Sequence, residues 1–562
     1  MANVSVRILG AGGEVGRSCF LVTIGSDSVL IDTGVHLSAS STDERIPSVP
    51  TDIEIVGIII THYHLDHIGA LPYLLEISEL ASLRDCDIYM STPTSLLAPP
   101  ILADYCRSGP NSDLFTPNHI IRCFQRIRTI SLNTETYINR SRNFSFTVFH
   151  AGHVLGGVGL LLKHQGTTVV YTGDFSVSED ALLKPVWIPQ LTLPAGGTDL
   201  VISECTHATR IAERSISVSE KELCSRITSA LKRNGKVLIP IFAVGRTQEI
   251  ASIIRAHLGA GPKLYTTSSS GKNASVITRS VARSWTVNRD LREVVDLDVK
   301  LLCDMTNLPS EPCVIFSSPA MIEGGISLEL FMQLCTNSRN LVLLTGYCSP
   351  DSVGNSVILF ASRRVANREV MVHGQRIEVN CECAYIPFSN HSDSPGIESV
   401  IRRCVPRNVI LVHGDKIKME TFSSKVKVAW ARDIDVRIPR NGDTLEYDTH
   451  YKRKLRSEVS IPVTIRRKLS ARCSDLQQLG HALSKSDKDI NITTYVDRIV
   501  VAADSVSISL SLVGETSEVV IEYVSDTYHQ STEWICYNRL IVWVKDALSR
   551  YVEDNFSISE CS

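Results

Sequence analysis

Short runs of aliphatic and β-branched residues recur through the first 200 residues, separated by polar turns. Apolar runs of about four to eight residues between turn signals are typical of buried strands. Residues 71–83 instead show apolar positions at helical spacing after Pro72. This mixture predicts an α/β fold of stacked sheets flanked by helices. The strands that we expect here span residues 4–9, 19–24, 29–31, 55–60, 168–171 and 200–203.

The pattern changes near Cys205. Residues 217–233 and 247–258 have helical periodicity, and a strand-like run at 236–240 lies between them. This arrangement predicts a second α/β unit. Buried-strand patterns then resume, at residues 341–345 and 409–412.

The C-terminal part of the chain has a different pattern. Apolar residues alternate with serine over 506–512, and a second apolar run at 519–524 follows a Gly-Glu-Thr turn, which predicts a β-hairpin. Residues 540–552 carry an apolar stripe at helical spacing. Because a hairpin and one helix are small for an independent core, we expect this part to dock on a partner.

The most basic stretch of the chain, residues 452–472, lies at the start of this part. It holds eight Lys or Arg residues and a single acidic one, Glu458. Three interpretations stay open for it: a solvated linker or helix face, a nuclear-import signal, or an RNA contact.

Composition excludes several classes of protein. The net charge of −3 over 562 residues rules out a generally basic nucleic-acid binder, so a nucleic-acid site must be a local patch. No stretch approaches the length and apolarity of a membrane span, and we expect no membrane association. The 16 cysteines lack paired C-x-x-C spacing, which favours reduced thiols in the cytosol or nucleus.

Candidate chemistry is concentrated in residues 62–67, His-Tyr-His-Leu-Asp-His, directly behind the strand predicted at 55–60. Four metal-competent side chains this close together cannot share one face of a helix or strand. A tight loop can direct His62 and His64 toward one cation and Asp66 and His67 toward another. Imidazole and carboxylate are the ligands of open, catalytic zinc sites.

Three further metal-competent residues have the same sequence context, because each lies in or near a turn beside an apolar run. Asp174 follows the run 169–173, His413 follows 410–412, and His153 lies among glycines that allow close backbone approach. Each residue alone would be weak evidence, because an Asp or His at a strand end is more often a capped turn. Together with the loop they predict a binuclear site with His62, His64 and His153 on one metal, Asp66, His67 and His413 on the other, Asp174 bridging, and Asp32 orienting the imidazoles from behind.

This series of residues resembles that of the metallo-β-lactamase fold, an αββα sandwich. In ordinary members the last histidine follows the bridging aspartate closely, whereas here a long segment between Asp174 and His413 leaves room for an inserted domain. Glu204 and His391 match two further motifs of the β-CASP nucleases, the branch that carries such an insertion. The resemblance implies a β-CASP α/β domain inserted in the sandwich and a small α+β C-terminal domain.

The resemblance also implies domain boundaries and an activity. We expect a metallo-β-lactamase domain in two parts, 1–206 and 379–450, a β-CASP cap at 207–378, and a C-terminal dimerisation or docking domain at 451–562. The implied activity is that of an endoribonuclease, a phosphodiester hydrolase that uses two Zn²⁺ ions on single-stranded RNA. The implied catalytic residues are Asp66, Glu204 and His391, and Arg246 is a candidate RNA phosphate contact or part of a structural ion pair.

Two branches of the family resemble the chain: the endonuclease subunits of the Integrator complex and of the cleavage and polyadenylation specificity factor. Segments 88–94, 187–188, 235–240 and 413–420 favour the Integrator branch. That branch implies a nuclear enzyme that cleaves nascent transcripts, such as small nuclear RNA 3′ ends. Its partners would be an inactive paralogous subunit, joined through the C-terminal domain, and other Integrator subunits. The remaining alternatives are an inactive scaffold paralogue, a DNA-repair nuclease and a bacterial-type exonuclease.

Overall fold

The structure is a computed structural model. It describes strands β23–β28 of the C-terminal region and residues 3–448, apart from gaps at 40, 79, 84–85, 108–113, 142, 179–181, 189–196, 212–215, 286–296, 347, 363–367 and 431–433. Contacts divide the chain into two compact units. The first comprises residues 1–188 and 199–450, and the second comprises residues 189–198 and 451–562. No helix of the described parts is long and apolar enough to cross a bilayer.

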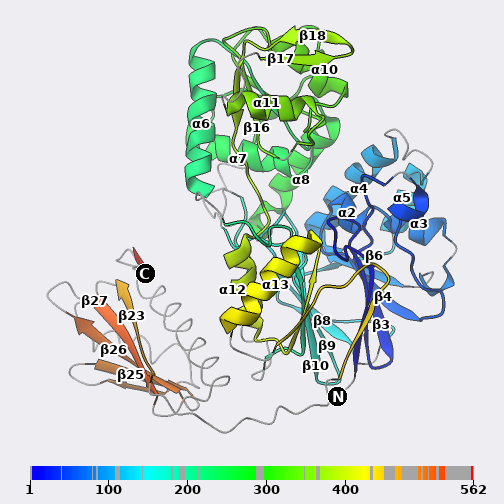
Figure 1. Cartoon of the computed structure of the whole chain (residues 1–562), viewed down its shortest axis with the longest axis vertical. Helices are drawn as coiled ribbons and strands as arrows, with labels where there is room; N and C mark the ends of the chain where they lie inside the picture. Colours follow the sequence, from blue (N-terminus) through cyan, green and yellow to red (C-terminus); the bar gives the residue numbers. More distant parts are fainter. Residues whose placement is uncertain are drawn as a thin grey trace. The chain divides into compact units, whose positions relative to one another are not determined.

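One half of the first unit's sandwich is a seven-stranded sheet in the order β22-β1-β2-β3-β4-β5-β6 (Figure 1). Its strands β3 to β6 are parallel, so their carboxyl ends lie at one edge of the sheet. The strands predicted at 4–9, 19–24, 29–31 and 55–60 are confirmed in this sheet. Its strands span Val4–Gly10 (β1), Cys19–Ile24 (β2), Asp27–Ile31 (β3), Ile55–Ile59 (β4), Asp87–Ser91 (β5), Ile127–Ile130 (β6) and Thr444–Tyr447 (β22).

The other half is a seven-stranded sheet in the order β21-β20-β11-β10-β9-β8-β7. Strands β10, β11, β20 and β21 are parallel. The strands predicted at 168–171, 200–203 and 409–412 are confirmed here, although β20 lies far along the chain from its neighbour β11. The strands span Glu135–Tyr137 (β7), Ser145–His150 (β8), Val158–His164 (β9), Thr167–Tyr171 (β10), Leu200–Glu204 (β11), Asn408–Val412 (β20) and Asp435–Arg437 (β21).

Helices cover the outer faces of the two sheets, which gives the αββα order. Helix α4 packs on β5 and β6, α5 packs beside α4, α3 packs beside α5, and α12 packs on β11 (Figure 1). A single buried apolar cluster takes side chains from both sheets and from α3, α4 and α5. The helices span Thr42–Arg45 (α1), Leu65–Ile68 (α2), Leu71–Glu76 (α3), Thr92–Arg107 (α4), Pro117–Phe124 (α5), Ser394–Cys404 (α12) and Lys416–Trp430 (α13).

The helix predicted over 71–83 is too long. Helix α3 ends at Glu76, and a separate 3-10 turn spans Ala81–Leu83. Ser78 explains the early end, because its hydroxyl donates to the Leu74 carbonyl and competes with the helical hydrogen bond.

Between β11 and β20 the chain builds a second α/β layer, the cap. Its six parallel strands have the order β14-β13-β15-β12-β16-β19. The α/β unit predicted over 217–258 is confirmed by the helices Ile216–Lys232 (α6) and Arg246–Leu258 (α7) and the strand β12 (Val237–Pro240) between them. The strands span Val237–Pro240 (β12), Leu264–Thr266 (β13), Val299–Leu301 (β14), Val314–Ser317 (β15), Leu341–Leu344 (β16) and Glu382–Tyr385 (β19), beside the hairpin Glu369–Val372 (β17) and Gln375–Glu378 (β18).

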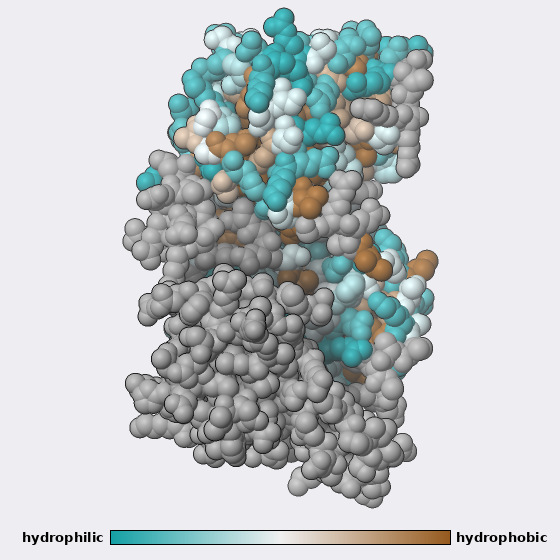
Figure 2. Space-filling view, turned by 90° about the vertical axis from the view of Figure 1, so that its left-hand side faces the viewer, coloured by the Kyte–Doolittle hydropathy of each residue, from teal (hydrophilic) through white to brown (hydrophobic). Residues whose placement is uncertain are grey.

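The cap helices span Ile216–Lys232 (α6), Arg246–Leu258 (α7), Ser269–Trp285 (α8), Gly325–Leu334 (α10) and Val353–Ala361 (α11). Helix α8 packs against α4, and its residues Ala274, Val281 and Trp285 belong to the buried cluster of the sandwich. Because β19 is part of the cap sheet, that sheet extends beyond residue 378, where we expected the cap to end. On the side that carries α6, the cap surface is mainly hydrophilic with small separate apolar spots (Figure 2).

The second unit contains a six-stranded sheet in the order β24-β25-β26-β27-β23-β28. The predicted hairpin is confirmed, because β26 and β27 pair antiparallel. The basic stretch 452–472 contributes strand β23, and the apolar stripe predicted at 540–552 lies outside the described residues. The strands span Val463–Ser470 (β23), Asn491–Thr494 (β24), Arg498–Ala503 (β25), Val506–Val513 (β26), Glu518–Ser525 (β27) and Ser559–Glu560 (β28).

Candidate metal centre

The loop that follows β4 carries four of the candidate ligands. Helix α2 begins at Leu65, with His64 at its N-cap position. It ends at Ile68, so the chain changes direction within about one helical turn. The amides of Ser18 and Thr33 bind the carbonyls of Asp66 and His67 at 2.7 Å each, which fixes the loop against the sheet. Gly34 permits this approach, since a Cβ there would lie 1.7 Å from the Asp66 carbonyl oxygen.

His62, His64 and His153 form the first donor set. Their nitrogens lie close together: His64 Nδ1 is 3.1 Å from His62 Nε2 and 3.1 Å from His153 Nε2. Burial lowers the pKa of His62 and His153 well below the ordinary value and that of His64 to about 4. Neutral imidazoles are the form that binds metal.

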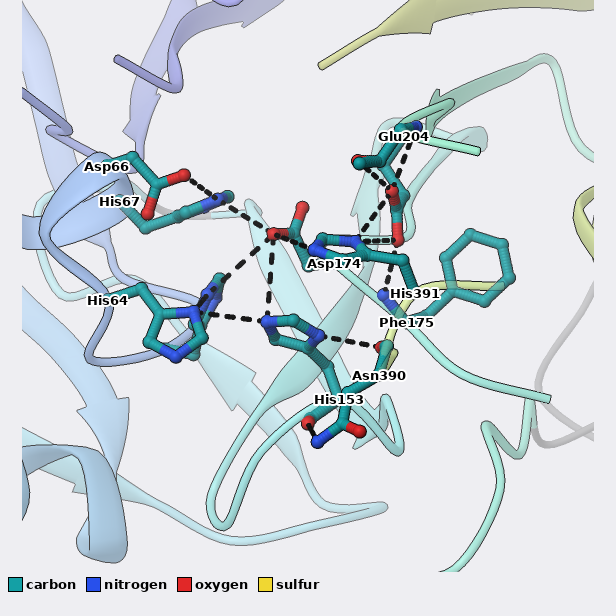
Figure 3. A network of polar contacts seen from close by, with 12 residues as sticks. His64, Asp66, His67, His153, Asp174, Phe175, Glu204, Asn390 and His391 are labelled. Atoms are coloured by element: carbon teal, nitrogen blue, oxygen red, sulfur yellow. Dashed lines mark hydrogen bonds and ion pairs between the residues drawn. The ribbon is translucent and has the colours of Figure 1, made fainter. Parts of the chain in front are cut away.

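Asp66, His67, Asp174 and His413 form the second set. His413 Nε2 lies 3.2 Å from Asp66 Oδ2, and His67 Nε2 lies 3.2 Å from Asp174 Oδ2. Asp174 Oδ2 is also 3.9 Å from His62 Nε2 and 3.8 Å from His153 Nε2, so this carboxylate lies between the two sets (Figure 3). The structure therefore brings together all seven residues predicted as ligands.

These residues fit zinc by donor chemistry and by spacing. Ligand atoms within each set lie within 4.8 Å of one another. Tetrahedral zinc with ligands at ~2.0–2.1 Å places neighbouring donors about 3.3 Å apart, close to the observed separations. In addition, Asp174 Oδ1 is buried and accepts no hydrogen bond from any described residue, with His413 Nδ1 3.4 Å away. A buried carboxylate oxygen of this kind is suited to a cation.

The backbone supports the site at two strand ends. Asp32 and His413 both have left-handed backbone conformations, with φ of 58° and 51°, directly after β3 and β20. Such conformations are uncommon for residues other than glycine and cluster at functional sites. Here they turn each side chain sharply off its strand and toward the centre.

Asp32 lies behind the ligands, where the sequence placed it. Its Oδ2 accepts a hydrogen bond from His67 Nδ1 at 2.8 Å, and Tyr171 donates to the same oxygen at 3.2 Å. A carboxylate in this position fixes the tautomer of a ligating imidazole and directs Nε2 at the metal. Thr61 extends this contact to the first set, because its hydroxyl binds both Asp32 and His62 Nδ1. We did not predict Thr61 from the sequence, although it directly precedes His62.

Glu204 and His391 form a pair beside Asp174. His391 Nδ1 lies 2.9 and 3.0 Å from the two oxygens of Glu204, and His391 Nε2 lies 3.9 Å from Asp174 Oδ2 (Figure 3). Burial lowers the pKa of His391, but the carboxylates of Glu204 and Asp174 outweigh it and raise that pKa to about 9. A bound cation acts in the opposite direction. His391 and Asp174 also form, with His153, a third cluster able to bind metal.

Thr206 connects the Glu204–His391 pair to the second donor set. Its hydroxyl lies 2.6 Å from Glu204 Oε2 and 3.0 Å from His413 Nδ1. The Phe175 amide also donates to Glu204, at 3.0 Å. The buried carboxylate is thus held on several sides. The sequence offered only the proximity of Thr206 to Glu204 as a signal.

Arg246 is partly exposed, and its guanidinium is bonded to neighbouring groups. Its Nη1 lies 2.9 and 2.7 Å from the oxygens of Glu249, one turn along α7, and its Nη2 donates to the Phe388 carbonyl at 3.2 Å. Its side chain is 22% exposed. The geometry favours the ion pair over the phosphate contact, which stays a prediction. Asn390 completes this group and contacts both Arg246 and His153.

An αββα sandwich whose strand ends carry this set of imidazoles and carboxylates defines a metal-dependent hydrolase of the metallo-β-lactamase class. Family models agree with the fold. Residues 21–195 match the metallo-β-lactamase superfamily domain, residues 222–357 the β-CASP domain, and residues 376–439 the Zn-dependent metallo-hydrolase RNA specificity domain.

Curated relatives identify the family more closely. The chain is 32% identical to Integrator complex subunit 11 of Gallus gallus, over 83% of this chain and 76% of the relative. It is also 32% identical to cleavage and polyadenylation specificity factor subunit 3-II of Arabidopsis thaliana, over 79% and 72%. The chain therefore belongs to the family of zinc-dependent metallo-hydrolases with β-CASP and RNA specificity domains that includes these two proteins.

A solved structure shares the fold at low sequence identity. A protein of unknown function from Enterococcus faecalis V583 superposes with a TM-score of 0.51 at 12% identity, covering 79% of this chain and all of that one. At this identity the likeness shows the fold alone.

Proposed function

We propose that the chain is an endoribonuclease that hydrolyses phosphodiester bonds in single-stranded RNA at the centre described above. The observation that supports this most is the Glu204–His391 pair next to Asp174, because it adds a proton donor to a set of metal ligands. Hydrolysis of a phosphodiester needs both, a group that stabilises charge on phosphorus and a group that protonates the leaving oxygen.

We assign the ligands as the sequence predicted them, for two zinc ions. His62, His64 and His153 would hold one ion, Asp66, His67 and His413 the other, and Asp174 both. Zinc bound there supplies an activated water and stabilises negative charge on the phosphoryl oxygens. Asp32 and Thr61 keep the imidazoles oriented toward the ions.

His391 is the proposed proton donor to the leaving 3′-oxygen. Glu204 accepts from Nδ1–H, which leaves Nε2 as the nitrogen that faces the centre. A protonated Nε2 can therefore give its proton to the leaving oxygen, while Glu204 stabilises the imidazolium beforehand. The products would be a 3′-hydroxyl and a 5′-phosphate.

Within the family, we propose that the chain is the catalytic subunit of an Integrator complex in the nucleus, acting on nascent transcripts such as small nuclear RNA 3′ ends. Integrator subunit 11 from Gallus gallus is among its relatives, and the segments at 88–94 and 235–240 favour the same branch. The alternative is the endonuclease of the pre-mRNA cleavage and polyadenylation machinery. It has comparable support, since the Arabidopsis thaliana relative is equally identical.

The test is cleavage by the chain purified with its native partners, because we expect partners to hold the cap open for RNA. Single-stranded RNA should be cut internally, and double-stranded RNA and single-stranded DNA should not. His391→Ala should retain zinc and RNA binding but lose about 10²–10⁴-fold in single-turnover cleavage. Full single-turnover activity of His391→Ala would show that another group protonates the leaving oxygen. Mononucleotide products would indicate an exonuclease, and a zinc-loaded but inert wild-type protein would indicate a scaffold.

A further inference from the structure

The segment that leaves the cap passes directly between the cap and the metal centre. After β19, the Phe388 amide donates to the Thr345 carbonyl at the end of the cap strand β16. Four residues later, the Ser392 amide donates to the Phe175 carbonyl of the sandwich, at 2.8 Å. Asn390 and His391 therefore lie at the crossing between the two layers.

Asn390 is buried, and both ends of its side chain are bonded. It is 8% exposed. Its Nδ2 donates to the His153 carbonyl at 2.9 Å and to Glu249 Oε2 at 3.0 Å, and its Oδ1 accepts from Arg246 Nη1 at 3.1 Å. The Asn390 side-chain amide thus joins the Arg246–Glu249 ion pair of the cap to the loop that carries the candidate ligand His153.

The backbone of Asn390 fixes the imidazole of His153. The Asn390 carbonyl lies 2.8 Å from His153 Nδ1 and accepts its proton, so Nε2 is the nitrogen left for a metal. His153 Nε2 lies in the first donor set, 3.1 Å from His64 Nδ1 (Figure 3). A carbonyl that holds the outer nitrogen of a ligating histidine sets both its tautomer and the direction of the ring.

The end of α7 that binds Asn390 also packs closely on the loop of residues 62–67. Glu249 and Arg246 lie in the first turn of α7, and the preceding Gly245 has φ of 85°. A Cβ at Gly245 would lie 2.5 Å from the hydroxyl of Tyr63. In the sequence, Tyr63 lies between the predicted ligands His62 and His64. The N-terminal end of α7 therefore touches the centre by two routes, through Tyr63 and through Asn390.

We propose that Asn390 is a clasp that couples the position of cap helix α7 to the geometry of His153. When α7 lies in its observed position, Glu249 and Arg246 hold the Asn390 amide, and Asn390 holds His153. Displacement of α7 breaks the contacts of Glu249 and Arg246 with the Asn390 amide. Asn390 then no longer holds His153 in place. Cap movement and metal binding at the first set are then linked, so that each affects the other by the same free energy. Asn390 and Glu249 act as positioning residues and touch no reacting atom.

This inference rests on the proposed ligand role of His153, which is tested first. His153→Ala should weaken zinc binding in a chelator competition measurement on the full chain. If it does not, the ligand assignment is wrong, and the clasp has no metal to act on. If it does, the clasp is tested independently by Glu249→Gln, which lies in the cap and contacts none of the predicted ligands.

Glu249→Gln and Asn390→Ala should each weaken the binding of one zinc ion by about 10–100-fold, the usual loss when a partner of a ligand is removed. The double variant should bind zinc no more weakly than Asn390→Ala alone, because Glu249 acts through Asn390. With cobalt in place of zinc, the visible spectrum should change in both single variants, since His153 changes its orientation.

A matched control separates this effect from simple loss of stability. Asn340 in the cap is also buried, and it also bonds through both ends of its amide, to the Leu334 carbonyl and the Lys236 amide. Asn340→Ala should lower the unfolding temperature by a similar amount and leave zinc affinity and the cobalt spectrum unchanged. Unchanged zinc affinity in Glu249→Gln, or additive losses in the double variant, would overturn the clasp.

Discussion

At the scale of single residues, Asp174 is the side chain on which the centre most depends. It lies within 4 Å of nitrogens from both donor sets and of the candidate proton donor His391. Its carboxylate is 3% exposed, so its charge must be balanced by neighbouring cations or protonated imidazoles. This position between the two donor sets is the one that the proposed bridging role requires.

Asp174→Ala should therefore weaken zinc binding at both sets. We expect metal analysis of the chelator-free protein to fall from about two ions per chain to one or none. RNA cleavage should disappear with it. Asp174→Asn is the control for packing, because it keeps the volume and removes only the charge. Full zinc occupancy in both variants would reject the bridging role.

The sequence predicted the candidate ligands that the structure brings together, because each lies in a short loop beside an apolar strand. His62, His64, Asp66 and His67 even share one loop. Of the residues that hold them, it predicted Asp32 but not Thr61, Thr206 or Asn390. Asn390 contacts His153 across 237 positions and Glu249 across 141 positions, and such pairings exist only once the cap has folded onto the sandwich.

At the scale of elements, the loop between β4 and α3 depends on its contact with the turn after β3. Gly34 lies where the two meet, and the closest atom to its added Cβ is the carbonyl oxygen of Asp66 at 1.7 Å. Backbone atoms cannot move aside as the end of a side chain can. The loop and its ligands must therefore shift if Gly34 gains a side chain.

Gly34→Ala should destabilise the protein by at least about 1–3 kcal/mol, the typical cost of overpacking a closed site. It should also lower zinc occupancy, since Asp66 is a proposed ligand in the second set. Thermal unfolding and metal analysis measure the two effects. Gly346→Ala is the control, because a Cβ there meets no atom of the described residues within 4 Å. Equal unfolding temperatures and zinc contents in the two variants would contradict this account.

Element boundaries show where periodicity is a good guide and where it fails. The strands predicted in the sequence, β12 among them, and the helices α6 and α7 were predictable, because their apolar patterns end at turn residues. The helix over 71–83 was overextended, since its apolar spacing continues past Ser78 while the Ser78 hydroxyl bonds to Leu74. The pairing of β19 with β16 leaves no local signal in the sequence.

At the scale of the whole molecule, the chain combines a catalytic unit and a separate C-terminal sheet. In that sheet, β26 alternates apolar residues with serine at positions 507, 509 and 511. Alternation of this kind gives a strand one apolar and one polar face, and the apolar face must be covered. We expect a partner to cover part of this unit, in the form of a paralogous subunit of the same fold.

Deletion of residues 451–562 should therefore remove the partners while leaving the metal centre intact. Affinity purification of the full-length chain, followed by mass spectrometry, should recover other Integrator subunits, and the truncated chain should recover few or none. Asp174→Ala in the full-length chain is the control, because it should lose zinc yet keep the partners. Zinc retained by the truncated chain would show that its catalytic unit still folds. Recovery of polyadenylation-machinery subunits instead would identify the alternative complex, and a full-length chain that cleaves RNA alone would contradict the need for a partner.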